Sequence, residues 1–200
     1  MEEVRLAYSV LAEQYIGLFG DAAKVHADDL ALITRHLSIQ PGVVLDVGCG
    51  PGQVTAYLRS LGVDASGIDL VATFVDHARR TYPGGRYEVG SMYRLPVPDH
   101  SVAGILAWYS LIHVPPDNLD SVLAELRRAM APASTLVVGF FDGNEIAPFD
   151  HKVTSAFYWP VDEFVARLKR AGFSEIERSQ RSADVESGQR SHAAIAAIAS

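Results

Sequence analysis

Residues 43–52 read Val-Val-Leu-Asp-Val-Gly-Cys-Gly-Pro-Gly, an apolar run that leads directly into three glycines. A short run without polar alternation is typical of a strand buried on both faces of a parallel sheet. Glycines let the backbone approach a ligand and adopt dihedral angles that a side chain would forbid. The helix predicted from about Gln53 to Leu61 would present free N–H groups to this turn. The stretch therefore predicts a strand, a ligand-binding turn and a helix.

The flanking sequence repeats this alternation of short strands and helices. Further strands are predicted at residues 65–68, 86–89, 102–108, 135–141, 173–181 and 192–198, the last of which is also compatible with a helix because it is rich in alanine. Helices are predicted within residues 1–40 and at residues 74–80, 117–130 and 161–171. Right-handed crossovers between parallel strands then give a doubly wound α/β sandwich. We expect one mostly parallel seven-stranded sheet, an antiparallel last strand and an N-terminal helical lid.

Composition and charge narrow the classes of function. Hydrophobic residues make up 48% and charged residues 20% of the 200 residues, as in ordinary globular proteins. The net charge of −7 argues against nucleic acid and anionic membranes as partners. The start of the chain lacks an apolar signal core, and no stretch approaches the roughly 20 apolar residues of a membrane span. Because Cys49 is the only cysteine, no disulfide can form within the chain, and we expect a cytoplasmic protein. We also expect a monomer or a homodimer.

The residues in and after the glycine turn indicate which ligand it binds. Gln53 stands where a dinucleotide fingerprint has its third glycine, and Pro51 removes an N–H from the turn. The Asp46 carboxylate would repel a phosphate but suits a cationic amino group. Asp69 ends the second predicted strand, where a carboxylate can accept both hydroxyls of a ribose. Leu70 beside it can cover an adenine face.

Further motifs occur in a fixed order along the rest of the chain. They are Leu95-Pro96-Val97-Pro98-Asp99, Ser110-Leu111-Ile112-His113-Val114 and Leu126-Arg127-Arg128-Ala129-Met130-Ala131-Pro132. With the glycine turn and the acid on strand two, they make the sequence resemble the class I S-adenosylmethionine-dependent methyltransferases, in particular the small type 11/25 family. The resemblance covers nearly the whole chain.

The resemblance implies a cofactor site for S-adenosylmethionine, with S-adenosylhomocysteine as product. Its residues would be Asp46, Gly48, Cys49, Gly50, Gly52, Gln53, Asp69, Leu70, Ser91, Met92 and Trp108. Asp46 and the three glycines would hold the methionine end, above Trp108 or its neighbours. Asp69 would hold the ribose, and Leu70, Ser91 and Met92 would meet the adenine.

The sequence departs from the family pattern at two positions of this site. Members commonly have an aspartate where Ser91 stands, so the adenine amino group would meet a weaker, neutral partner. Members commonly have a helix-capping serine where Val71 stands, so the following helix is expected to start later, at Thr73.

The resemblance also implies a domain organisation and a reaction. The chain would be a single methyltransferase domain over residues 1–200. Its parts would be a helical lid at 1–40, a cofactor-binding core at 41–141, a substrate-side loop at 142–160, and a helix and hairpin at 161–200. About 20 to 40 residues remain outside the core for substrate recognition, too few for a dedicated tRNA- or protein-binding module. We therefore expect methyl transfer to an oxygen, nitrogen or carbon atom of a small molecule.

Histidines and tyrosines are the candidate residues on the acceptor side. His113 follows strand four at the ligand edge, where it could be a base, could orient the acceptor, or could only bond a backbone carbonyl. Tyr15, which could reach the methionine carboxylate, is a second catalytic candidate. Substrate contacts are expected from Tyr8, Tyr109, His113, His151 and Tyr158, with His151 alternatively an exposed loop residue. The other histidines, His26, His36, His77, His100 and His192, are expected at the surface, and no cluster has metal-ligand spacing.

Two alternative functions remain open at this point. A nicotinamide-dependent oxidoreductase would use a related fold, although the glycine spacing and Asp46 argue against it. A non-catalytic protein could have retained the S-adenosylmethionine pocket and lost turnover.

Overall fold

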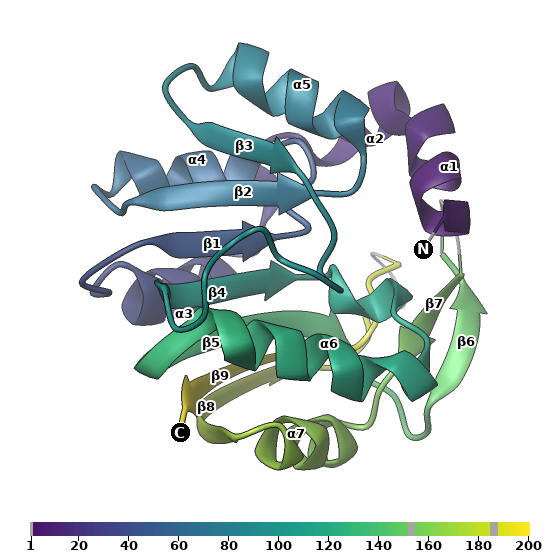
Figure 1. Ribbon diagram of the computed structural model, residues 1–200. Coiled ribbons are helices and arrows are strands. Elements are labelled where there is room, and N and C mark those ends of the chain that lie inside the picture. The colour runs from purple at the N-terminus through teal and green to yellow at the C-terminus, as the bar shows by residue number, and fades with distance from the viewer. Residues whose placement is uncertain (1, 152–154, 185–187) are drawn as a thin grey trace.

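A computed structural model describes residues 2–151, 155–184 and 188–200 (Figure 1). Seven strands form one sheet in the order β3-β2-β1-β4-β5-β9-β8. They are β1 (Val44–Val47), β2 (Ala65–Asp69), β3 (Arg86–Val89), β4 (Val102–Trp108), β5 (Met130–Phe141), β8 (Phe173–Arg181) and β9 (His192–Ala199). β1 to β5 are parallel, and β9 lies antiparallel between β5 and β8. The predicted fold class is confirmed.

Helices cover both faces of this sheet. They are α1 (Glu2–Val10), α2 (Ala12–Phe19), α3 (Ala27–Leu37), α4 (Gln53–Ser60), α5 (Ala72–Thr81), α6 (Pro116–Ala129) and α7 (Val161–Arg170), with short 3-10 turns η1 (Ala22–Lys24) and η2 (Leu111–His113). Successive residues of one strand face opposite sides: Ile105 packs in the core with α6 and α7, whereas Leu106 packs with α3 and α4. Double-sided burial explains why the strands read as unbroken apolar runs.

The alanine-rich segment that could have been a helix is the strand β9. It has hydrogen-bonded neighbours on both sides, since Ala194 is opposite both Gly139 of β5 and Ser179 of β8. Ala193 and Ile195 contact one core and Ala194 contacts the other. Tertiary context therefore overrides the helical preference of alanine.

The parallel strands all end at the same edge of the sheet, where α1, α2 and a separate ribbon lie (Figure 1). The ribbon pairs β6 (Ala147–Asp150) with β7 (Ser155–Tyr158) in antiparallel orientation. The prediction of a loop at 142–160 was therefore wrong for these eight residues, and residues 152–154 lie outside the described residues. The ribbon was missed because its two strands are short and only half-buried.

Two local predictions were also wrong. Helix α5 begins at Ala72 rather than at Thr73, because Asp69 accepts a hydrogen bond from the Val71 backbone N–H at 2.8 Å and supplies the missing cap. His192 is buried rather than at the surface, with 2% of its area exposed.

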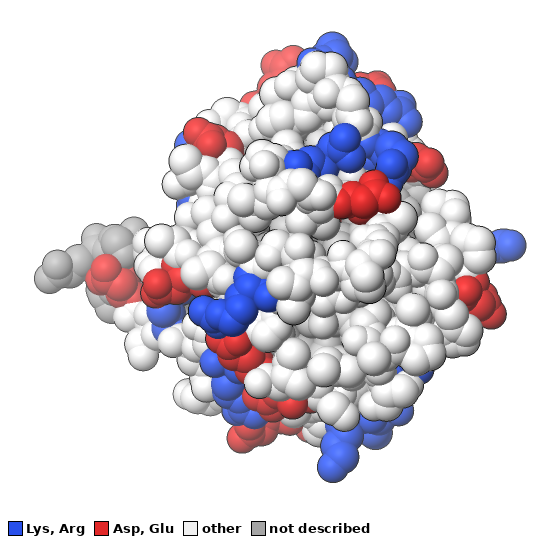
Figure 2. Space-filling model, turned by 90° about the vertical axis from the view of Figure 1, so that its left-hand side faces the viewer, with Lys and Arg blue, Asp and Glu red and all other residues white. Residues whose placement is uncertain are grey.

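The opposite edge of the sheet, where the parallel strands begin, carries both signs of charge. Figure 2 shows acidic and basic side chains interspersed on this face. Arg86 pairs with Asp64 at 2.5 Å and Arg128 with Asp99 at 2.6 Å. In the described part of the chain, no helix combines the length and apolar character that a membrane crossing requires.

Candidate functional site

The glycine turn adopts a backbone that only glycine takes without strain. Gly48, Gly50 and Gly52 have φ angles of 78°, 53° and 87°. A Cβ atom on Gly52 would lie 2.7 Å from Cβ of Ala78 and 2.9 Å from the Tyr87 ring. The turn therefore packs tightly against α5 and β3 on one side while its other side lines a cavity.

Asp69 ties the turn to the start of α5. Its Oδ2 accepts a hydrogen bond from the Gly50 N–H at 2.8 Å, and its Oδ1 accepts one from the Val71 N–H. Burial raises the pKa of Asp69 to about 6, and these backbone hydrogen bonds oppose the rise. The carboxylate is thus held at the cavity wall in one orientation, ionised at neutral pH.

A second acidic group lies behind the turn. Asp46 is 2% exposed and accepts a hydrogen bond from the Thr55 hydroxyl at 2.6 Å. Burial raises the pKa of Asp46 to about 7. The nearby Gln53 side chain has a buried Oε1 with no hydrogen-bond partner among the described residues. Both groups line a cavity, and both suit a ligand that brings hydrogen-bond donors or a positive charge.

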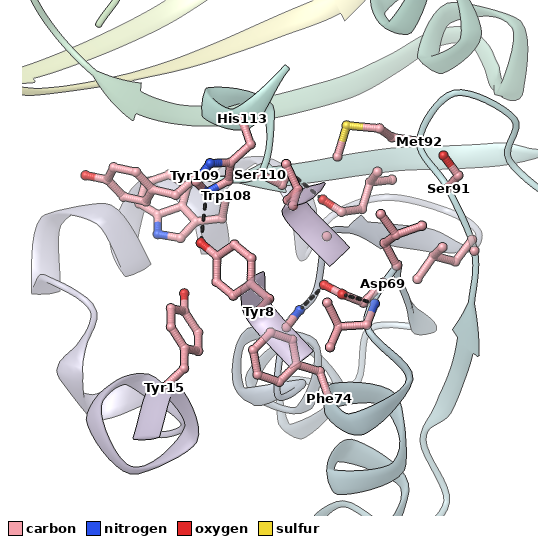
Figure 3. A pocket seen from close by; sticks show the side chains of 18 residues that line it. Tyr8, Tyr15, Asp69, Phe74, Ser91, Met92, Trp108, Tyr109, Ser110 and His113 are labelled. Atoms are coloured by element: carbon pink, nitrogen blue, oxygen red, sulfur yellow. Dashed lines mark hydrogen bonds between the residues drawn. The ribbon is translucent and has the colours of Figure 1, made fainter. Parts of the chain in front are cut away.

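Asp69 and the turn form one wall of a first cavity of about 80 Å³ (Figure 3). Predicted site residues that line it are Tyr8, Tyr15, Gly48, Gly50, Asp69, Leu70, Ser91, Met92, Trp108, Tyr109 and His113. The ring of Tyr8 reaches across this space from α1 toward His113. These eleven predicted cofactor and acceptor residues are thus brought to one place.

Tyr8 and His113 are joined by a hydrogen bond that fixes the state of the imidazole. Nδ1 of His113 lies 2.9 Å from the Ser155 carbonyl oxygen and must donate to it. Nε2 therefore accepts the hydrogen bond of 2.8 Å from the Tyr8 hydroxyl. Burial lowers the pKa of His113, so the ring is neutral. His113 therefore bonds a backbone carbonyl and also lines the first cavity.

A second cavity of about 450 Å³ adjoins the first along the sheet edge and shares Tyr8, Tyr15, Gly48, Gly50, Trp108 and Tyr109 with it. The predicted site residues Asp46, Cys49, Gln53 and His151 line only this second cavity. The ring of His151 packs edge-to-face against the ring of His113, with the two centroids 5.4 Å apart. A volume of this order accommodates a small organic molecule.

Two of the predicted site residues do not line either cavity. Gly52 and Tyr158 line neither cavity; the Tyr158 hydroxyl accepts a hydrogen bond from Arg190, and its ring packs on Phe149. Burial raises the pKa of the Cys49 thiol, as suits a small filler residue. Sequence reasoning missed Ser110, whose hydroxyl donates to the Val47 carbonyl oxygen at 2.6 Å beside the turn; its place after strand four was the available signal.

Comparisons with known proteins agree with this geometry. A family model described as "Methyltransferase domain" matches residues 44–133. The malonyl-[acyl-carrier protein] O-methyltransferase of Yersinia pestis is 28% identical over 183 residues, which are 79% of this chain and 64% of that protein. The trans-aconitate 2-methyltransferase of Methylobacterium nodulans is 31% identical over 140 residues, 67% of this chain and 50% of that protein. The chain spans 40% to 64% of the length of the first curated relatives.

Solved structures show the same fold. The 1,6-didemethyltoxoflavin-N1-methyltransferase of Burkholderia thailandensis, solved with 1,6-didemethyltoxoflavin and S-adenosylhomocysteine bound, superposes with a TM-score of 0.82. The match covers 100% of this chain and 88% of that chain, at 19% sequence identity.

Proposed function

Because this chain belongs to the class I S-adenosylmethionine-dependent methyltransferases, we propose that it transfers a methyl group from S-adenosylmethionine to a small-molecule acceptor. One observation carries the proposal: Asp69 and the glycine turn face Tyr8 and His113 across a single cavity. Methyl transfer requires that the donor and the acceptor are aligned. The Asp69 carboxylate suits the ribose of the donor, and the polar pair Tyr8 and His113 suits the acceptor. Cytoplasm remains the proposed location, because Cys49 is the only cysteine.

The cofactor is S-adenosylmethionine, whose sulfonium makes its methyl group ready for displacement. Asp69 suits the ribose hydroxyls, with Leu70 against the adenine and Ser91 and Met92 at its edge. The carboxylate of Asp46 and the unpaired Oε1 of Gln53 suit the α-amino group, since both are acceptors that have spare capacity. Tyr15, at the lid side of both cavities, suits the carboxylate end.

His113 acts on the acceptor as an orienting group in this proposal. Nε2 of its neutral ring can accept a hydrogen bond from the acceptor molecule when the hydrogen bond from the Tyr8 hydroxyl is broken. The Ser155 carbonyl holds the ring orientation through Nδ1. Tyr8 and His113 therefore select an acceptor that presents a hydrogen-bond donor beside the methyl group.

Binding and transfer are tested separately. Isothermal titration calorimetry with S-adenosylhomocysteine should show binding at one site, and absence of affinity refutes the proposal. Radiolabelled S-adenosylmethionine should then transfer its methyl group to members of a panel of small alcohols, phenols, amines and carboxylic acids. Binding without transfer to any member would favour a non-catalytic S-adenosylmethionine-binding protein, and a preference for NAD in thermal-shift assays would favour an oxidoreductase.

Cofactor affinity should depend on pH through Asp46. The cationic amino group binds the ionised carboxylate, and burial raises the pKa of that carboxylate to about 7 in the free protein. Protonation below this pH removes the charge, so affinity falls as pH falls. The Kd for S-adenosylhomocysteine should be about tenfold larger at pH 6 than at pH 8. Asp46→Asn should flatten this dependence; a wild-type Kd that is constant between the two pH values contradicts the assignment.

A further inference from the structure

A chain of four linked polar side chains runs along the wall of the second cavity. The Tyr109 hydroxyl is hydrogen-bonded to Nδ1 of His192. Nε2 of His192 lies 3.2 Å from Oδ1 of Asp29. Arg181 donates to both oxygens of Asp29, at 2.7 and 2.8 Å. All four side chains line the second cavity, and Tyr109 also lines the first.

These residues come from separate elements. Tyr109 follows β4, His192 begins β9, Asp29 lies in the first turn of α3, and Arg181 ends β8. His192 is 2% exposed and Asp29 is 3% exposed. A buried carboxylate and a buried imidazole are costly to remove from water unless they are paired, so their presence at a cavity wall calls for an explanation.

The backbone at Tyr109 supplies an independent observation. Its φ angle is 53°, in the left-handed region that large side chains rarely adopt. Such a conformation is strained and occurs preferentially at functional sites. The Tyr109 N–H donates to the Gly139 carbonyl oxygen at 3.0 Å, and its ring packs on Phe141 with centroids 4.8 Å apart. These contacts thus hold Tyr109 in a strained backbone conformation that only a glycine would adopt without strain.

The partners of His192 define its tautomer. Asp29 can only accept, because burial, which raises its pKa, is outweighed by the combined effects of Arg181 and His192, which lower the Asp29 pKa to about 2. Nε2 of His192 lies 3.2 Å from that carboxylate, outside hydrogen-bond geometry among the described residues. Two acceptor lone pairs at this distance would repel each other, so the proton belongs on Nε2. Nδ1 then accepts from the Tyr109 hydroxyl, which leaves the lone pairs of the Tyr109 oxygen for a ligand in the cavity.

We propose that Tyr109 is the catalytic group that takes the proton of the methyl acceptor, with His192 and Asp29 acting through it. This inference rests on the proposed methyl transfer. The acceptor O–H or N–H bond breaks as Tyr109 gains that proton, and the original Tyr109 proton passes to Nδ1 of His192. The acceptor forms its bond to the methyl carbon, and the electron pair of the broken S–C bond stays on sulfur as the thioether. His192 later releases its proton to water.

Two opposite charges lie near His192. Asp29 on α3 stabilises the imidazolium that forms. Arg181 on β8 opposes it, since its guanidinium is bonded to both oxygens of Asp29 and offsets part of that carboxylate's charge. Tyr109 is neutral before and after the step. The residues lining both cavities place no carboxylate against His113, whose imidazole partners are Tyr8 and the Ser155 carbonyl. His113 therefore lacks the neighbouring carboxylate that His192 has.

The relay implies a class of acceptor. A carboxylic acid is already ionised at neutral pH and needs no base. A hydroxyl or N–H group keeps its proton until the methyl group arrives, and gains from a positioned base. We therefore infer that the natural acceptor is methylated on a hydroxyl oxygen or on a nitrogen that bears a proton.

Nuclear magnetic resonance of ¹⁵N-histidine-labelled protein tests the resting state without any acceptor. The His192 ring, identified by its loss in His192→Asn, should carry its proton on Nε2. The Tyr109→Phe variant should alter the Nδ1 resonance by removing its hydrogen bond. A proton on Nδ1 of His192 overturns the proposal.

Transfer rates test the relay itself. 4-Methylphenol, protonated at neutral pH, and pentafluorophenol, ionised at neutral pH, are a matched pair of probes. Tyr109→Phe and His192→Asn should each lower kcat with 4-methylphenol, or with any alcohol or amine accepted from the panel, by about 100-fold or more, and should change kcat with the ionised probe less than about 3-fold. The matched controls are Tyr82→Phe and His36→Asn; Tyr82 and His36 have hydrogen-bond partners outside both cavities.

The outcomes separate this proposal from the proposed function. If the wild-type protein does not bind S-adenosylhomocysteine, the proposed methyl transfer is refuted. Equal losses with both probes indicate a structural role and overturn the relay. Given intact S-adenosylhomocysteine binding, transfer to carboxylates alone, or to no hydroxyl or amine, also overturns the relay.

Discussion

Asp69→Ala should weaken the binding of S-adenosylhomocysteine by about 1–3 kcal/mol, or roughly 5- to 150-fold, because it removes a charged hydrogen-bond acceptor from the ribose. The same change also releases the N–H groups of Gly50 and Val71, which Asp69 now orients. The glycine turn and the start of α5 would then lose a shared anchor. Titration calorimetry measures the binding loss, and thermal unfolding shows whether the variant remains folded.

Asp64→Ala is the matched control, because Asp64 precedes the same strand at the opposite edge of the sheet. Asp64 is exposed, and among the described residues its carboxylate pairs only with Arg86 on the surface. Its removal should leave affinity unchanged, since exposed ion pairs contribute little. A folded Asp69→Ala protein with wild-type affinity would remove the ribose assignment.

Gly52→Ala should have the largest effect on stability. The left-handed backbone costs an alanine about 1–2 kcal/mol, and the overlap with Ala78 and Tyr87 adds about 1–3 kcal/mol. The Cβ of Ala78 is fixed on α5 and cannot rotate away. Equilibrium denaturation should therefore show a loss of about 2–5 kcal/mol in the free energy of unfolding.

Gly62→Ala separates the two contributions. Gly62 has a φ angle of 86°, nearly that of Gly52, but nothing lies within 4 Å of its built Cβ. Only the backbone strain remains, so the loss should be about 1–2 kcal/mol. Equal losses in the two variants would mean that the contacts of the glycine turn with α5 and β3 are loose enough to yield.

The sequence predicts the parts of the site that depend on local patterns. The run from Val44 to Val47 identifies a strand buried on both faces, and the glycines that follow identify a turn with positive φ angles. Parallel strands end at one edge, so Asp69 on the next strand was expected beside that turn. These inferences need only strand periodicity, turn chemistry and the direction of crossovers.

The parts that the sequence did not predict depend on contacts between distant segments. Asp29 and His192 are 163 positions apart by their numbering, and each alone looks like a surface residue. Nothing local shows that β9 begins beneath Tyr109, so His192 was placed at the surface. The β6–β7 ribbon was missed for a related reason: it is stabilised by pairing and by its position over η2, not by a long apolar pattern.

The position of β9 affects how the sheet can be completed during translation. β9 is made after β8 but lies between β5 and β8. While a ribosome makes residues 142–191, the outer edge of β5 lacks a partner, and β8 has no strand beside it. Unpaired edges invite association between nascent chains, and distant partners pair slowly. The eight residues of β9 therefore set the moment at which both edges close, and a pause before their synthesis would prolong the interval in which the growing chain is prone to aggregate.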